Sequence, residues 1–174
     1  MKVLIVGCGR TGSRLAARLA LSGQDVTIID EKREAFARLT PDFPGTTLQG
    51  SGLDIEVLKR AKTETFDIVM ALTGGDNRNL MLAQMVKIQF KVPRAVARLH
   101  DPVRAAKYRE LGVETICTTT VIEGLLELYV RNGDFPELPG EMSTAGDATC
   151  LDRHEILSPP QPASNGNHSG ASDH

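Results

Sequence analysis

The sequence predicts an α/β fold, in which helices cover both faces of a parallel sheet, and three observations support this prediction. Apolar runs of strand length alternate six times with helical patterns within residues 1–134. The first run, KVLIVG at 2–7, is continuously apolar, as expected of a strand covered on both faces. It leads directly into the glycine-rich segment GCGRTG at 7–12, before the first helical pattern. We therefore predict a doubly wound, six-stranded sheet with right-handed crossovers.

The elements of the first half follow from local patterns. After the strand at 2–7, a helix at 11–23 places Leu15, Ala16 and Leu19 on one face and stops at Gly23. DVTIID at 25–30 is the second strand. A short helix at 32–40 closes before Pro41, and TTLQG at 46–50 is a brief third strand.

The second half repeats this alternation up to residue 133. Its predicted strands are 66–72, 94–99 and 114–118, and its predicted helices are 53–62, 76–90, 102–112 and 121–133. In the last helix Ile122, Leu125, Leu126 and Tyr129 recur at the spacing of one helical face. The domain therefore spans residues 1–134. Residues 135–174, rich in Pro, Gly, Ser, Asn and His, are expected to be a low-complexity, largely disordered tail.

Composition excludes several classes of protein. The net charge of −2 gives no case for binding nucleic acid or an anionic membrane, and no apolar run reaches about 18 residues. The N-terminal MKVLIVGCG predicts a strand and a turn rather than a signal peptide. Cys8, Cys117 and Cys150 show no metal-ligand spacing and are expected to be reduced thiols of a cytosolic protein. Cys8 is interpreted as a small residue that fits the glycine loop or, alternatively, as a redox-sensitive thiol.

The glycine loop is the main candidate site. Gly7 permits a tight turn, Gly9 lets the backbone approach a pyrophosphate, and Gly12 lets the following helix pack close to the strand. The helix N-terminus then offers free N–H groups to phosphate. The alternative is a glycine turn needed only for packing. Arg10, inside the loop, suggests that phosphate charge is read, unless it simply faces solvent.

Further candidates lie where the other strands end. Asp30 is placed to accept a ribose 2′-OH and would repel a 2′-phosphate, although it could instead cap the next helix. Asp76 and Asn79 are candidates for capping the helix at 76–90, and His100 is interpreted as incidental. We find no Ser/His/Asp grouping, paired carboxylates or metal cluster in the sequence. The chain is therefore expected to bind a nucleotide but to have little with which to transform one.

The segments VGCGRTGSRLA, VTIID, QGSGLDIEVL, DIVMALTGGDNRNLMLAQMVK, VPRAVARLHDP and LGVETICT occur in the order and spacing of one family. Over about residues 1–130 the chain resembles the N-terminal nucleotide-binding domain of RCK proteins, the Trk/Ktr-type regulators of potassium conductance. The resemblance implies a Rossmann-like domain that binds ATP, ADP or NAD(H), with AMP also possible. It implies dimers that assemble into a ring on the cytoplasmic face of a potassium-translocating membrane subunit.

The resemblance also assigns roles to residues of this chain. The glycine loop would hold phosphate, Asp30 ribose, and residues 51–53 the adenine, while residues 73, 74 and 98 complete the rim. Glu31 and Lys32 follow on the same rim, as contacts or as solvated surface. The helix at 121–131 would be the crossover helix that packs on a partner subunit. The candidate nucleotide-binding residues are Gly7, Gly9, Arg10, Thr11, Gly12, Asp30, Glu31, Lys32, Ser51, Gly52, Leu53, Leu72, Thr73, Gly74 and Arg98.

Three departures from the family pattern matter. Many members continue into a second ligand-binding domain, where this sequence has residues 135–174. The chain is therefore expected either to have a companion RCK subunit as partner or to use nucleotide control alone. Thr119 and Thr120 stand where many relatives carry a proline and a glutamate, so no cation site is predicted. Ser51 replaces the usual aspartate beside the adenine.

The resemblance thus implies a cytoplasmic gating subunit, without enzymatic activity, that controls potassium flux in response to a bound nucleotide. The alternatives are a subunit of an NAD(H)-dependent oxidoreductase and a stand-alone NADH redox sensor.

Overall fold

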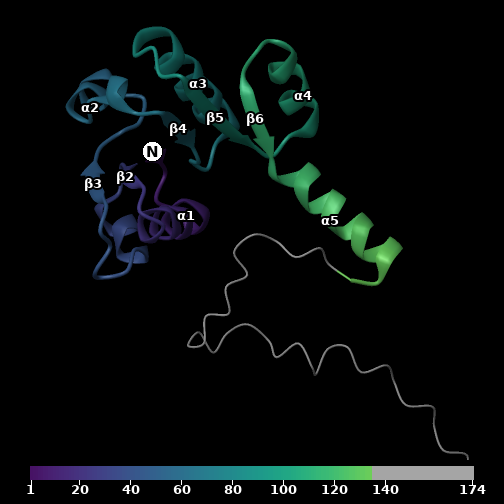
Figure 1. The fold of residues 1–174 in the computed structure, drawn as a ribbon. Helices are drawn as coiled ribbons and strands as arrows, with labels where there is room; N and C mark the ends of the chain where they lie inside the picture. The colour runs from purple at the N-terminus through teal and green to yellow at the C-terminus, as the bar shows by residue number, and fades with distance from the viewer. Residues whose placement is uncertain (135–174) are drawn as a thin grey trace, which may run out of the picture. The chain divides into compact units, whose positions relative to one another are not determined.

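A computed structural model describes residues 1–134 and confirms the predicted α/β class. The tail predicted at 135–174 lies outside the described residues. All strands are parallel, and their order is β3-β2-β1-β4-β5-β6 (Figure 1). The order reverses between β1 and β4, which is where open sheets of this kind bind ligands. The strands are β1 (Lys2–Val6), β2 (Asp25–Asp30), β3 (Thr46–Gln49), β4 (Ile68–Ala71), β5 (Arg94–Leu99) and β6 (Glu114–Cys117).

The helices follow the predicted positions with two differences. They are α1 (Arg10–Leu21), α2 (Ile55–Arg60), α3 (Asp76–Gln89), α4 (Pro102–Glu110) and α5 (Thr118–Asn132), with 3₁₀ turns η1 (Arg33–Arg38) and η2 (Thr63–Thr65). The short helix expected after β2 is the 3₁₀ turn η1, a form common in short connectors.

The second difference is that α5 begins at Thr118, earlier than the predicted residue 121, so it follows β6 without a loop. The hydroxyls of Thr118 and Thr119 donate to the carbonyls of Leu99 and His100, at 3.3 and 2.6 Å. These contacts to the end of β5 outweigh the low helix propensity of β-branched residues.

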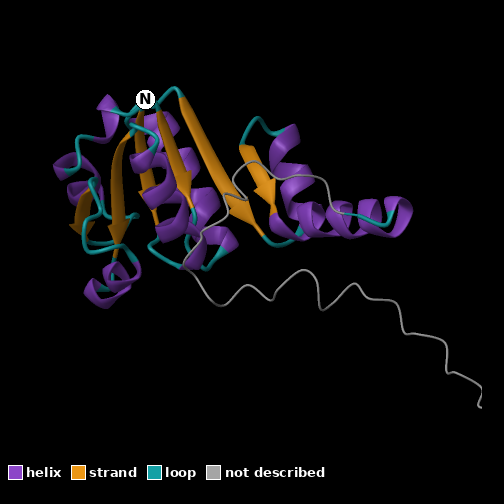
Figure 2. Ribbon diagram, turned by 60° about the horizontal axis from the view of Figure 1, so that its bottom comes forward, coloured by secondary structure: helices purple, strands orange, loops and turns teal. Residues whose placement is uncertain are grey.

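Two apolar layers cover the two faces of the sheet (Figure 2). Leu4 and Val6 of β1 face the layer formed with α2, α3 and α4, whereas Val3 and Ile5 face α1 and η1. Burial on both faces explains why the first strand is apolar at successive positions.

The α1 side of the sheet is not covered as far as β6. Ile116 is exposed there and Val96 is only half-buried, and no residue of α5 is buried. In Figure 1, α5 leaves the end of β6 and points away from the sheet. Exposed apolar residues of α5 include Val121, Ile122 and Leu126. These apolar side chains are therefore open to solvent in the described part of the chain.

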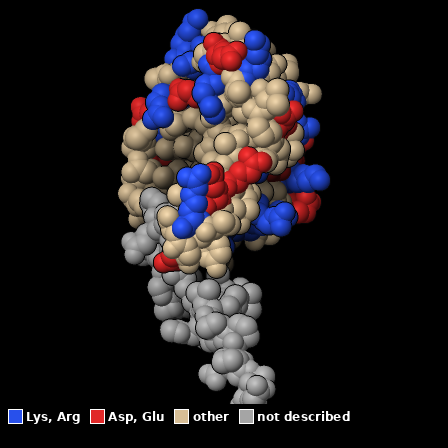
Figure 3. Space-filling view, turned by 90° about the vertical axis from the view of Figure 1, so that its right-hand side faces the viewer, with Lys and Arg blue, Asp and Glu red and all other residues tan. Residues whose placement is uncertain are grey.

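On the face shown in Figure 3, basic and acidic side chains are interspersed, so this face has no patch of a single charge. Among residues 1–134, no helix combines the length and the apolar character needed to cross a bilayer.

The first turn of α1 packs directly on the end of β1. Gly7 has a φ of +110°, which favours glycine, and a Cβ there would lie 2.9 Å from the backbone of Leu72. A Cβ at Gly12 would lie 1.9 Å from the carbonyl oxygen of Gly7. The close helix–strand approach predicted from the sequence is therefore present.

We expect Gly12→Ala to lower the free energy of unfolding by roughly 1–3 kcal/mol, because helix and loop must separate to admit the methyl group. Gly9→Ala is the matched control, since Gly9 has negative φ and nothing lies within 4 Å of its Cβ position. Its effect should stay within about 0.5 kcal/mol. Urea unfolding of both variants measures this difference, and equal losses would contradict the packing argument.

Candidate functional site

A pocket of about 470 Å³ opens where the strand order reverses. Its volume is within the usual range for small-molecule sites. All the residues predicted to bind nucleotide line this pocket, except Gly12 and Ser51. The predicted residues in the lining are Gly7, Gly9, Arg10, Thr11, Asp30, Glu31, Lys32, Gly52, Leu53, Leu72, Thr73, Gly74 and Arg98.

The two exceptions have structural roles beside the pocket. Gly12 lies under the glycine loop, against the Gly7 carbonyl. The hydroxyl of Ser51 accepts from the backbone N–H of Leu53 at 3.3 Å and so shapes the loop after β3. Neither residue lines the pocket, and the contact of Ser51 with the adenine stays a prediction.

Six further residues line the pocket that sequence reasoning missed: Val6, Ile29, Arg38, Gly50, Arg78 and Leu82. Val6 and Ile29 are the last buried residues of β1 and β2, whose carboxyl ends form the site. The strand pattern of the sequence could have identified both. Arg78 and Leu82 are four residues apart and therefore share one face of α3. Arg38 comes from η1, whose course the sequence pattern did not predict.

Asp30 fixes the glycine loop to the end of β2. One carboxylate oxygen accepts from the backbone N–H of Cys8 at 2.7 Å, and the other accepts from Lys32 N–H at 2.8 Å. The side chain caps no helix, because the N-cap of η1 is Lys32 and no side chain caps it. Each carboxylate oxygen can accept a further hydrogen bond, so Asp30 remains able to receive a ribose hydroxyl.

The pocket is positively charged although the chain is not. Arg10, Lys32, Arg38, Arg78 and Arg98 line it, against the carboxylates of residues 30 and 31. Within the described residues, the side chains of the first three make no hydrogen bond or ion pair. Among the described residues no side chain caps α1, and its first residues, with their free N–H groups, line the same pocket. Such a pocket attracts an anion with several charges.

Arg98 lines the pocket and keeps one donor unsatisfied among the described residues. Its Nη2 donates to the carbonyl oxygen of Thr73 at 2.8 Å, which fixes the side chain against the loop after β4. Its Nε is buried and has no hydrogen-bond partner among the described residues. Because buried donors are rarely left unpaired in proteins, Nε is a candidate contact for an anionic ligand.

Asn79 holds the ends of β4 and β5 together. Its amide oxygen accepts from the N–H and the hydroxyl of Thr73, at 2.9 and 2.6 Å. Its amide nitrogen donates to the carbonyls of Thr73 and Arg98, at 3.1 and 2.8 Å. The side chain is fully buried, so all four of its bonding positions are used without water. The predicted capping role for Asn79 is wrong, because the amide joins two strand ends instead.

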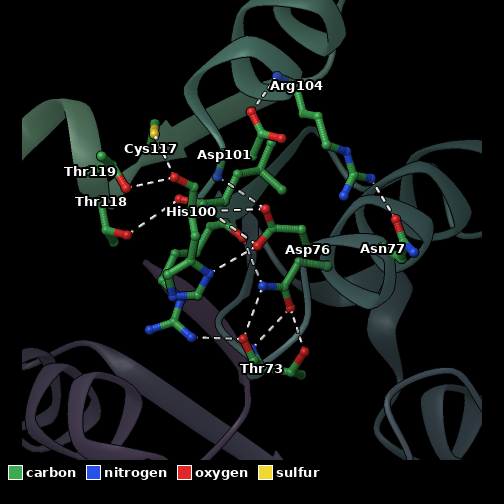
Figure 4. A network of polar contacts seen from close by, with 12 residues as sticks. Thr73, Asp76, Asn77, His100, Asp101, Arg104, Cys117, Thr118 and Thr119 are labelled. Carbon is green, nitrogen blue, oxygen red and sulfur yellow. Dashed lines mark hydrogen bonds and ion pairs between the residues drawn. The ribbon is translucent and has the colours of Figure 1, made fainter.

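Asp76 joins the start of α3 to the end of β5 (Figure 4). Its carboxylate accepts from the backbone N–H groups of His100 and Asp101 and lies 2.9 Å from His100 Nδ1. Burial opposes ionisation, but these hydrogen bonds outweigh it and hold the pKa of Asp76 below its ordinary value. The predicted capping role is therefore wrong for Asp76 too, and His100 is part of this network.

Cys8 is buried and its thiol donates to the carbonyl of Ala35 at 3.3 Å. Burial, together with the negative charge of Asp30, raises the pKa of the thiol to about 11. A thiol held protonated in this way is a poor nucleophile, which favours the interpretation of Cys8 as a small packing residue.

Comparison with known proteins identifies the domain. Residues 3–119 match the TrkA-N domain family. The chain belongs to the TrkA-N family. It is 38% identical over 118 residues to the Trk system potassium uptake protein TrkA of Streptomyces coelicolor, and this match covers 68% of the chain and 53% of the relative. The TrkA homolog of Methanothermobacter thermautotrophicus is 29% identical over 153 residues, covering 87% of the chain and 69% of the relative. The chain thus matches about half the length of the Streptomyces protein.

Solved structures share the fold of this TrkA-N domain. The Kef C-terminal domain of Shewanella denitrificans in an AMP-bound form has a TM-score of 0.62 at 20% identity, covering 77% of this chain and 83% of that chain. A structure of GsuK bound to ADP has a TM-score of 0.63 at 18% identity, covering 76% and 34% of the two chains. The GsuK channel bound to NAD gives 0.64 at 19%, covering 76% and 23%. The Rossmann-like fold expected from the RCK resemblance is confirmed.

We expect Asn79→Ala to lower the free energy of unfolding of this TrkA-N domain by about 2–4 kcal/mol, because buried donors and acceptors of Thr73 and Arg98 lose their partner. Asn77→Ala is the control. Asn77 is exposed on the same helix and makes one bond, to Arg104, so its replacement should cost less than about 1 kcal/mol. Urea denaturation tests both, and similar losses would show that the Asn79 contacts are not the source of stability.

Proposed function

We propose that this chain is the nucleotide-binding, regulatory part of a potassium transport system and acts at the cytoplasmic face of the membrane. The observation that carries the proposal is the cationic pocket at the switch point of a TrkA-N domain. Within residues 1–134, Arg10 makes no ion pair and Arg98 Nε is buried without a hydrogen-bond partner. The names of the curated relatives, as Trk system potassium uptake proteins, support the transport role.

The proposed ligand is an adenine nucleotide, ATP or ADP, or NAD(H), with AMP also possible. Each offers a ribose for Asp30 and phosphates for the glycine loop and the arginines. Structures of the same fold that are described as bound to AMP, ADP and NAD support this class of ligand. We propose no metal ion as part of the site.

The nucleotide would act as a signal rather than as a reactant. Of the described residues that line the pocket, none is a His, Cys or Ser, and only Asp30 and Glu31 carry carboxylates. Asp30 is bonded to two backbone N–H groups, and Glu31 lies 3.6 Å from Arg78. Both carboxylates are therefore engaged in contacts that hold the loop and the pocket mouth, with no His, Cys or Ser beside them to form a nucleophile–base pair. Control would then come from different contacts of the nucleotide in two states of the assembly.

The proposed partners are a second copy of this chain or a companion RCK subunit, within a ring that docks on a potassium-translocating membrane subunit. The uncovered region around Ile116 and the apolar residues of α5 support this proposal. A helix without a buried residue gains little stability from its own domain, so a partner is needed to bury its apolar side chains.

A thermal-shift panel with ATP, ADP, AMP, NAD, NADH and NADP tests the nucleotide proposal, because a ligand of the folded state raises Tm. We expect ATP and ADP to stabilise the protein to different extents. Arg10→Ala should narrow the ratio of their Kd values in calorimetry, because it removes a charge that contacts phosphate. Arg14→Ala, an exposed arginine of α1 outside the pocket, should leave that ratio unchanged.

Each other outcome of the panel has a definite meaning. Stabilisation by NAD or NADH alone would favour a redox sensor or an oxidoreductase subunit over the gating role. An unchanged ATP/ADP ratio in Arg10→Ala would remove that residue from phosphate sensing.

We expect Leu126→Asp to weaken self-association about tenfold or more, because it places a carboxylate on the apolar surface of α5. Val103→Asp makes the same change at an exposed apolar position of α4 and should have no such effect. Sedimentation equilibrium of the wild type and both variants measures the dissociation constants. Equal association of all three would contradict the assignment of α5 to the interface.

A further inference from the structure

One ion pair spans the mouth of the pocket. Arg78 Nη1, from the start of α3, lies 3.6 Å from Glu31 Oε1, which follows β2. Both side chains line the pocket, and about half of each is exposed, 50% for Arg78 and 46% for Glu31. An exposed pair of this kind contributes little to stability. Its position over the pocket therefore suggests a role in binding.

The part of the pocket that lies beside this pair is apolar. Arg78 and Leu82 share one face of α3 and both line the pocket. A Cβ at Gly52 would lie 2.3 Å from Val6 Cγ1 and 3.6 Å from Leu82 Cδ2, so the backbone after β3 packs directly on an apolar wall. Leu53, the residue after Gly52, also lines the pocket. A flat aromatic group fits such a wall better than a phosphate does.

Arg78 differs from the other arginines that line the pocket, because it alone of them forms an ion pair within the described residues. Its positive charge is already paired with Glu31, whereas Arg10 makes no ion pair within residues 1–134. A paired guanidinium attracts phosphate less, but its plane remains able to stack on an aromatic ring. Glu31 also restrains the long side chain, which lowers the entropy lost when it covers a ligand.

We propose that Arg78, held by Glu31, stacks on the adenine base of the bound nucleotide. The base would then lie between the guanidinium on its solvent side and the apolar wall of Val6, Gly52 and Leu82. This inference rests on the proposed nucleotide-binding function. It assigns base recognition to α3 and to the end of β2, and it leaves the phosphates to the glycine loop and to Arg10 and Arg98. Arg78 thus contributes to affinity in the same way for every adenine nucleotide.

Calorimetry with ATP, ADP and AMP on the full chain tests this assignment. Arg78→Ala should raise all three Kd values by a similar factor, about three- to thirtyfold, because stacking does not depend on the number of phosphates. Arg78→Lys keeps the charge but loses the planar group, so it should show most of the same loss. Glu31→Gln should show a smaller loss, since it only loosens the restraint on Arg78.

Arg94→Ala is the matched control. Arg94 pairs with Glu114 at 3.5 Å, is similarly exposed, and does not line the pocket, so its Kd values should equal those of the wild type. Tm without ligand should be the same for all variants, which separates loss of binding from loss of folding.

Two results would overturn the stacking role while leaving the proposed function intact. One is a loss in Arg78→Ala that grows from AMP to ATP, which would make Arg78 a phosphate contact. The other is unchanged affinity for all three nucleotides. If the wild-type protein bound none of them, the proposed function itself would fail, and the stacking role with it.

Discussion

The rest of the structure depends on the direct backbone contact between Gly7 and Gly12. It sets where α1 begins relative to β1, and so it fixes the direction of the glycine loop. The loop in turn presents the Cys8 N–H to Asp30, which ties it to β2. The positions of the glycine-loop residues in the pocket therefore depend on a single place where no side chain fits.

A second constraint orients α3. The buried Asn79 amide ties the loop after β4 to the end of β5, and the Asp76 carboxylate makes a similar connection one turn earlier. Since both residues belong to α3, the helix has little freedom to rotate. This fixed orientation brings Arg78, which lies between them, to the pocket. The polar residues that hold the fold and the residues proposed to bind ligand are therefore interleaved on one helix.

Most of the fold could be predicted from the sequence because the central strands β1, β2 and β4 are short apolar runs bounded by turn residues and separated by helical patterns. The glycine loop and Asp30 could be placed for the same reason, because the loop directly follows β1 and Asp30 is the last residue of β2. The roles of Asn79 and Asp76 could not be predicted, because helix capping and a tertiary hydrogen bond use the same residue types. Arg78 escaped notice because a charged residue on a helix is usually solvated, and nothing local shows that Glu31 lies opposite.

The start of α5 was misplaced for a related reason. Three successive threonines are more typical of a strand than of a helix. The carbonyls of Leu99 and His100, which accept from the hydroxyls of Thr118 and Thr119, lie at the end of β5, 19 residues earlier in the sequence. Local propensity contains no information about such partners.

The strand order has a consequence for how the domain folds. The central strand β1 pairs with β2 and also with β4, so Val3 must find both Val26 and Ile68. Parallel pairing between such distant segments is slow, because the chain loses loop entropy before the contacts stabilise it. Gly7 packs against Leu72, so the glycine loop reaches its final form only after β4 has docked. During synthesis the segment with β1 therefore leaves the ribosome long before β4 is available to pair with it. The pocket can form only at a late stage of folding, when both strands are in place.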